Sequence, residues 1–220
     1  GTGKSGEPDA PTFFIIIKDM EQMVCFMLMG WALAIIVFKA VATAQERKTL
    51  TRDLLEIPEG QRVLPEDTRS LIHRLQELPG GTQRMSLVRV LRTALIRFSH
   101  QADIQDVSAA KTGVLEVESA RLDSQLSIIR YIAWAIPSMG FIGTVRGIGE
   151  ALGHADKAIE GDISLVTDSL GVAFNSTFVA LVISIALMFA VHMLELFQEG
   201  LIIDVDQYCE EKLVANLHKA

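Results

Sequence analysis

Two threonines inside long apolar segments are the residues of this chain best suited to chemistry. Thr144 lies in the stretch 137–149, which also holds one proline and four glycines, and Thr177 lies in the uncharged stretch 169–191. Small residues let a second helix come close, and a hydroxyl both donates and accepts hydrogen bonds. Two such hydroxyls on adjacent apolar helices predict an ion path. The alternative is that each hydroxyl bonds only to a carbonyl of its own helix.

Small residues recur around both threonines at helical spacing. The first face steps by three and four residues through Pro137, Gly140, Thr144, Gly147 and Ala151. The second face consists of Ala173, Thr177, Ala180 and Ser184. Gly143 and Gly147 also form the Gly-x-x-x-Gly spacing that lets helix backbones approach closely. Ordinary helix packing within one subunit and the wall of a pore both agree with these faces.

Ionisable side chains are missing from the same stretches. No Asp, Glu or His occurs in 131–145 or in 169–191, and proton transport through a bilayer normally needs an ionisable group. We therefore expect that this chain does not carry protons by titration of its own side chains at mid-membrane. If the path conducts, another polypeptide supplies the acid. His192 and Glu195 follow the second stretch and are expected at the membrane boundary rather than in a relay.

The elements that position these residues are expected to be membrane helices. Half of the 220 residues are hydrophobic and 21% are charged, and the apolar residues are clustered. About 20 mostly apolar residues are enough for a helix to cross a bilayer. We therefore predict an all-α polytopic membrane protein with three transmembrane helices. These helices are expected at 21–42, 126–152 and 163–193.

The distribution of positive charge predicts the orientation. Of the 20 Lys and Arg residues, 14 lie between Lys39 and Arg130, and positive residues near the ends of spans stay on the cytoplasmic side. The segments expected outside are 1–20 and 153–162, and those expected inside are the helical region 43–125 and the C-terminal helix 194–220. The net charge of −7 argues against a nucleic-acid partner.

Two apolar stripes extend the last two membrane helices into the inside region. The stripe before the second span consists of Leu115, Leu122, Leu126 and Ile129. The stripe after the third span consists of Leu194, Phe197, Leu201, Val205 and Tyr208. Steps of three and four residues are typical of one face of a helix. A short outside turn between two such helices predicts a long helical hairpin that extends into the cytoplasm, with Asp162 and Ser164 as candidate caps.

The N-terminal sequence Gly1-Thr-Gly-Lys-Ser looks like the end of a phosphate-binding loop. That motif needs an upstream glycine, a strand before it and a helix after it, and none is available here. The chain shows no nucleophile–base pair and no catalytic carboxylate pair, and its five histidines are scattered. Cys25 and Cys209 lie at different levels and cannot form a disulfide. A nucleotide-using enzyme is therefore the weakest hypothesis, and we predict a protein that is not an enzyme and holds no metal or cofactor.

The motif around Thr144 resembles a known family. Pro137-x-x-Gly140-x-x-Gly143-Thr144-Val-x-Gly147-Ile looks like the second-span signature of the MotA/TolQ/ExbB proton-channel family, and the Thr177 helix looks like its last span. The resemblance covers about residues 128–197. Three spans with a large inside region after the first resemble the TolQ/ExbB branch, because the flagellar-stator branch has four spans.

The resemblance implies an energy-transducing complex of the bacterial inner membrane, with the N-terminus in the periplasm and the C-terminus in the cytoplasm. In such complexes five copies surround a dimer of a single-span partner of the ExbD/TolR/MotB kind. The partner's membrane Asp carries the ion, and ion flow is coupled to mechanical work. By position, Thr144 and Thr177 match the two family threonines of the ion path. The residues implied to form the pore wall or to face the partner are Pro137, Gly140, Gly143, Gly147, Ala173, Asn175, Ser176, Ala180 and Ser184.

Two departures from the family pattern leave questions open. Arg146 follows Thr-Val where family members often have a bulky apolar or aromatic residue, and it is expected to pair with Glu150 one helical turn later. Asn175 and Ser176 add oxygen ligands of the kind that Na⁺ prefers. The transported ion is therefore H⁺ or Na⁺, with protons favoured. A membrane scaffold that does not conduct is the alternative function.

Overall fold

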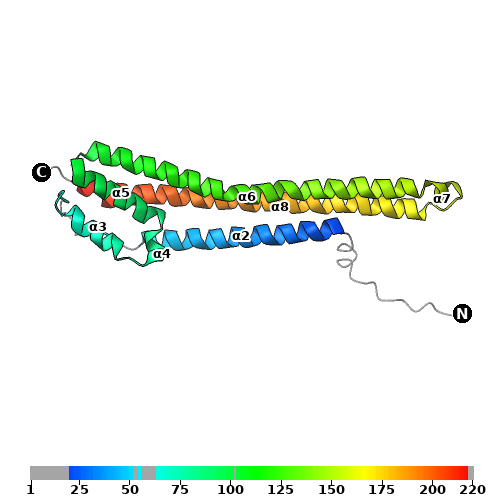
Figure 1. Cartoon of the computed structure of the whole chain (residues 1–220), viewed down its shortest axis with the longest axis horizontal. Helices are drawn as coiled ribbons and strands as arrows, with labels where there is room; N and C mark the ends of the chain where they lie inside the picture. Colours follow the sequence, from blue (N-terminus) through cyan, green and yellow to red (C-terminus); the bar gives the residue numbers. More distant parts are fainter. Residues whose placement is uncertain (1–19, 52–53, 56–62, 102, 218–220) are drawn as a thin grey trace. The chain divides into compact units, whose positions relative to one another are not determined.

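The computed structural model describes residues 20–51, 54–55, 63–101 and 103–217. Across these residues the elements are helical, apart from one isolated bridge between Val63 and Leu217. The helices are α2 (Met20–Leu50), α3 (Thr68–Gln76), α4 (Gly80–Gln83), α5 (Ser86–Gln101), α6 (Ile104–Gly153), α7 (Ala155–Ile159), α8 (Ser164–Lys212) and the 3₁₀ helix η1 (Val214–Asn216). Figure 1 shows their order along the chain.

Three of these helices, α2, α6 and α8, are long and apolar enough to cross a membrane. They contain the predicted spans 21–42 and 126–152 and nearly all of 163–193. The prediction of an all-α protein with three membrane helices is therefore confirmed. The span limits and the assignment of segments to either side of the membrane stay predictions. The expected outside segment 1–20 and the phosphate-loop-like sequence lie outside the described residues, except for Met20.

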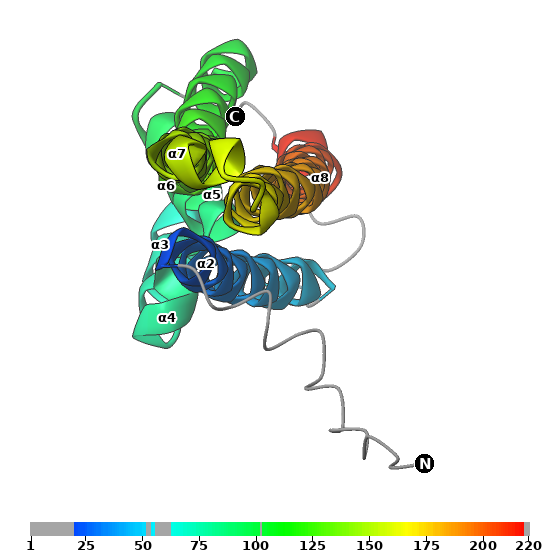
Figure 2. The ribbon, with the colours of Figure 1, turned by 90° about the vertical axis from the view of Figure 1, so that its right-hand side faces the viewer.

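The chain divides into two compact units, of which the first comprises residues up to Ile36 together with Ile128–Val191. In this unit α2, α6 and α8 lie next to one another, as the view along the helices shows (Figure 2). Most of the apolar side chains buried between them are small or β-branched, for example Ala32, Ile136 and Ala180. Large apolar side chains point outward instead, and Trp134 and Phe178 are 69% and 66% exposed. Such an apolar exterior suits contact with lipid or with other protein chains.

The connection between α6 and α8 holds α7 and a tight turn. Gly161 has a φ of 100°, a left-handed conformation that glycine adopts without strain. The Asp162 carboxylate then accepts hydrogen bonds from the backbone N–H and the hydroxyl of Ser164, at 3.1 and 2.5 Å. These bonds hold the pKa of Asp162 below its ordinary value. Asp162 and Ser164, the two candidate caps, are thus bonded to each other at the start of α8.

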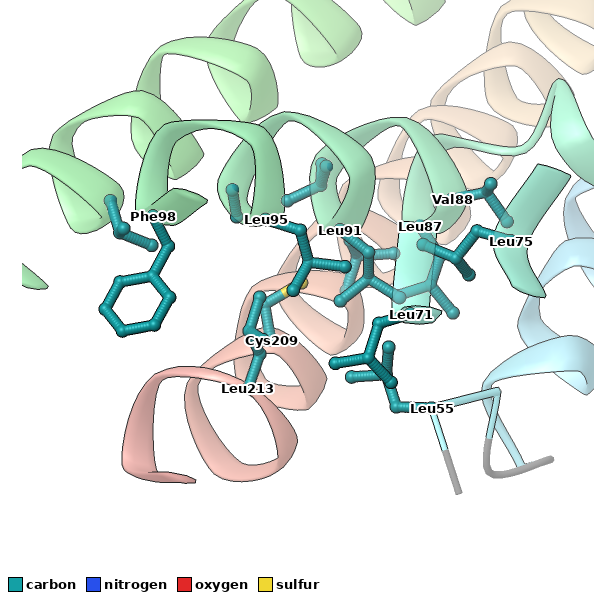
Figure 3. Packing of buried hydrophobic residues seen from close by; sticks show 14 of the residues in the cluster. Leu55, Leu71, Leu75, Leu87, Val88, Leu91, Leu95, Phe98, Cys209 and Leu213 are labelled. Carbon is teal, nitrogen blue, oxygen red and sulfur yellow. The ribbon is translucent and has the colours of Figure 1, made fainter. Parts of the chain in front are cut away.

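The second unit comprises residues 37–127 and 192–220. Leucine, valine and phenylalanine side chains of α5 pack against α3 and the C-terminal part of α8 (Figure 3). The predicted stripes take part in this packing, since Leu115, Leu201 and Val205 are buried in the same cluster. Burial raises the pKa of the Cys209 thiol in this cluster to about 12.

Ion pairs supplement the apolar core of the second unit. The Lys111 ammonium on α6 lies 2.8 Å from Asp206 and 2.6 Å from Glu210, both on α8. Arg47 on α2 donates to Asp204 at 2.6 Å. Pro65 and Pro79 lie between helices of this unit.

Candidate ion-path site

The hydroxyls of Thr144 and Thr177 are in direct contact across α6 and α8. Thr177 Oγ1 lies 2.8 Å from the carbonyl oxygen of Gly140, so it donates across the interface. Thr144 Oγ1 lies 3.2 Å from the same carbonyl and 3.4 Å from that of Ala173. Each hydroxyl has one hydrogen, and both side chains are half-buried. The pair is therefore a neutral, partly accessible chain of donors and acceptors rather than two isolated groups.

Pro137 and Ser184 form a matched pair in the same interface. Proline has no N–H, so Pro137 cannot donate to the carbonyl of Ala133 one turn earlier in α6. The Ser184 hydroxyl of α8 donates to that carbonyl at 2.8 Å. A proline inside a membrane helix is tolerated when a neighbouring serine satisfies the freed group in this way. The sequence indicated that both residues lie on small-residue faces, but their pairing depends on the register of the two helices.

Three glycines of α6 allow the backbone of α8 to come close. A Cβ atom at Gly140 would lie 2.6 Å from Ala180 Cβ, and one at Gly147 would lie 2.7 Å from Ala173 Cβ. At Gly143 it would lie 2.6 Å from Ser176 Oγ. These distances are too short for any side chain. The glycines thus face α8 of the same chain, as the interpretation of close helix packing predicts.

The other predicted site residues lie on α8. Ala173 and Ala180 are fully buried, and Asn175 is half-buried. Ser176 is buried and donates to the carbonyl of Ala173 in its own helix at 2.8 Å. The structure therefore brings the predicted residues together in one α6–α8 interface. A role in a pore wall or in contact with a partner stays a prediction for all of them.

Arg146 carries the positive charge of this region. Its Nε lies 3.6 Å from Glu150 Oε1, as expected from their spacing. A second carboxylate that the sequence interpretation missed is closer, because Glu21 Oε2 on α2 lies 3.1 Å from Arg146 Nη2. In the sequence-based prediction Glu21 is only the first residue of the span 21–42. The sequence signal for this contact was an acidic residue at the start of an apolar helix. The sequence does not show which residue of another helix this acid contacts.

Among the described residues, the remaining His, Glu and Cys side chains do not extend the site. His192 and Glu195 pair with each other at 3.7 Å. Within the described ranges no group of three His, Cys, Asp or Glu side chains is arranged to hold a metal ion. Cys25 and Cys209 are both free and buried.

Three apolar helices, two of them joined by a short turn and packed through glycines and hydroxyls, define a polytopic helical membrane protein. The profile of the MotA/TolQ/ExbB proton channel family matches residues 82–207, more than half of the chain. The chain belongs to this family, and the resemblance stated from the sequence is confirmed. It is thus a channel-type membrane subunit of energy-transducing complexes, a class defined by transport rather than by catalysis. No curated protein and no solved structure matches the chain.

Proposed function

We propose that this chain conducts ions as one subunit of a motor-like complex in the bacterial inner membrane. The observation that supports the proposal is the contact between the Thr144 and Thr177 hydroxyls, which joins the two family motifs across α6 and α8. A hydroxyl chain can pass a proton or partly replace the water around an ion, but it cannot store the charge. Five copies would surround a dimer of a single-span partner whose membrane Asp holds the ion. The outer side would carry the N-terminus and α7, and the second unit would lie in the cytoplasm.

The transported ion in this proposal is the proton, with Na⁺ as the competing ion. The threonine and serine hydroxyls of the α6–α8 interface are already engaged with backbone carbonyls or with one another, for example Ser176 with Ala173. A dehydrated Na⁺ would need several of these oxygens at once, whereas a proton needs only one acceptor at a time. The geometry therefore favours proton transfer along the pair.

The test uses the complex that this chain forms in its native membrane, purified and reconstituted into liposomes. Thr144→Ala and Thr177→Val are expected to abolish proton flux, measured with a pH-sensitive dye, while the size of the complex is unchanged. Thr167→Val is the matched control. Thr167 is exposed, and its hydroxyl donates only to backbone carbonyls three and four residues earlier in the chain. Full proton flux in both Thr144 and Thr177 variants would contradict the assigned path.

A scaffold that does not conduct is the second candidate. The close fit of Gly140, Gly143 and Gly147 against α8 favours it, because glycines that serve packing within one chain need no pore. This candidate predicts that the native complex has no partner helix in its centre and shows no ion flux before any substitution is made.

A further inference from the structure

Glu21 is a buried carboxylate at the start of the first candidate membrane helix. Its side chain is only 7% exposed, and it belongs to the first turn of α2. Removing a charge from water is costly, and loss of one partner of a buried ion pair leaves an uncompensated charge. Ionisable side chains inside membrane helices are therefore rare and mostly mark the paths of ions. The pair with Arg146 holds the charge in place, but a pair of apolar residues would join α2 to α6 at lower cost.

The Glu21 side chain lies beside Gly143, the residue that precedes Thr144. Glu21 Cγ lies 3.7 Å from the point where Gly143 would carry a Cβ, and Ser176 Oγ lies 2.6 Å from the same point. Gly143 and Ser176 directly precede Thr144 and Thr177 in the sequence. Since a helix rises about 1.5 Å per residue, the Glu21 side chain meets α6 about one residue along the helix axis from Thr144.

The same turn of α2 holds polar groups whose hydrogen-bonding capacity is unused. Gln22 is 1% exposed, and neither atom of its side-chain amide has a hydrogen-bond partner within the described part of the chain. Glu21 Oε2 likewise has no aligned donor there, although Arg146 is close. Buried polar atoms are nearly always hydrogen-bonded, so exceptions call for a functional explanation. A carboxylate and an amide oxygen with free lone pairs form a site for a proton or a small cation.

We propose that Glu21 is an ion-accepting carboxyl that this chain itself supplies, and that it passes protons between the outer side and the Thr144–Thr177 pair. The proposal rests on the proposed function. A proton from the outer side forms an O–H bond on the Glu21 carboxylate, and Arg146, which keeps its charge, is then held by Glu150 at 3.6 Å. Loss of that proton toward the hydroxyls restores the carboxylate and its pair with Arg146. No electrons are transferred, and the charged groups facing Glu21 that this cycle involves are Arg146 and Glu150.

The same liposome assay, in a potassium buffer without sodium, tests the proposal. Because a positioned acid or base typically speeds proton transfer by two to four orders of magnitude, Glu21→Gln is expected to lower proton flux on the order of 100-fold. The complex should keep its size on a sizing column. Asp168→Asn is the matched control, since Asp168 is an exposed acid in the first turns of α8, and its flux should equal that of the unmodified complex.

A double variant separates proton transfer from mere neutralisation of Arg146. Glu21→Gln with Arg146→Gln removes both charges and leaves no unpaired ion, so it should assemble and still fail to conduct. Normal flux in the double variant, or failure of both Glu21 variants to assemble, would make Glu21 a structural residue and overturn the proposal. Sodium flux that depends on Glu21 in place of proton flux would also overturn it. Normal flux in Glu21→Gln with loss in Thr144→Ala would reject only this inference, whereas normal flux in both would reject the proposed function.

Discussion

A single hydrogen bond between α6 and α8 explains how α6 accommodates Pro137 in its apolar segment. The carbonyl of Ala133 has lost its helical donor and receives one from Ser184. In hydrocarbon no water can take over this bond, so the serine and the proline depend on each other. The interface is therefore specified by particular pairs of residues, in addition to the small size of its side chains.

A double-mutant cycle on Pro137 and Ser184 should reveal this dependence. Ser184→Ala is expected to destabilise the protein by about 1 kcal/mol, because it leaves a buried carbonyl without a donor. In a Pro137→Ala background the new backbone N–H can bond to that carbonyl, and the same serine substitution should then cost much less. Thermal unfolding in detergent measures both differences. Equal losses in the two backgrounds would show that Ser184 stabilises the protein by some other contact.

A second prediction concerns single glycines of α6 that lie against α8. Gly140→Ala puts a Cβ 2.6 Å from Ala180 Cβ, so the helices must separate or shift. Overpacking of this kind typically costs about 1–3 kcal/mol, and a lower unfolding temperature with reduced assembly is expected. Gly149→Ala is the control on the same helix, because a Cβ there meets nothing within 4 Å. A neutral effect at Gly140 would indicate that α6 and α8 are not packed this closely.

Individual helices of the second unit are joined by charge as well as by leucines. Lys111 is 5% exposed, and the carboxylates of Asp206 and Glu210 hold its ammonium between α6 and α8. Burial acts to lower the pKa of Lys111, but the two carboxylates outweigh this effect and raise it above the ordinary value. A raised pKa means that the pair stabilises the folded state fully at neutral pH and that this stabilisation is lost only as the pH rises through the pKa of the folded protein.

Lys111→Met should therefore destabilise the second unit at neutral pH. Loss of the ammonium leaves two half-exposed carboxylates that water can still reach, so we expect about 1–3 kcal/mol rather than the full cost of a buried charge. The temperature at which the buried Cys209 thiol becomes reactive to maleimide reports on this unit. Lys212→Met is the control, because Lys212 is an exposed lysine at the end of α8. An unchanged temperature for Lys111→Met would mean that the apolar cluster alone sets the stability.

Features that depend on one helix at a time could be predicted from the sequence. Clusters of apolar residues predicted the three membrane helices, although only the third cluster has an uncharged stretch long enough to span by itself. Three- and four-residue steps predicted the buried faces through Gly140 and Ala180. The pairs Pro137–Ser184 and Glu21–Arg146 could not be predicted in this way. They depend on the axial register and rotation of one helix against another, which is set by the sum of many small packing contacts. The pair of Arg146 with Glu150 could be predicted because both residues belong to the same helix.

For the whole molecule, the distribution of charge predicts the orientation in the membrane. The positive residues cluster between Lys39 and Arg130, and such residues resist transfer across the membrane. We therefore predict that the connection containing α7 lies on the outer side and that the α3–α5 region lies on the inner side.

Cysteine labelling of spheroplasts can test this orientation with little background. Cys25 is buried, and the pKa of Cys209 is raised to about 12 by burial, so very little of the reactive thiolate is present at neutral pH. Asp156→Cys on α7 and Glu66→Cys before α3 both introduce exposed thiols. A maleimide that does not cross membranes should label the first in intact spheroplasts and the second only after lysis. Labelling of Glu66→Cys before lysis, with Asp156→Cys protected, would invert the orientation. It would also place the Glu21 carboxyl on the side where protons leave rather than on the side where they enter.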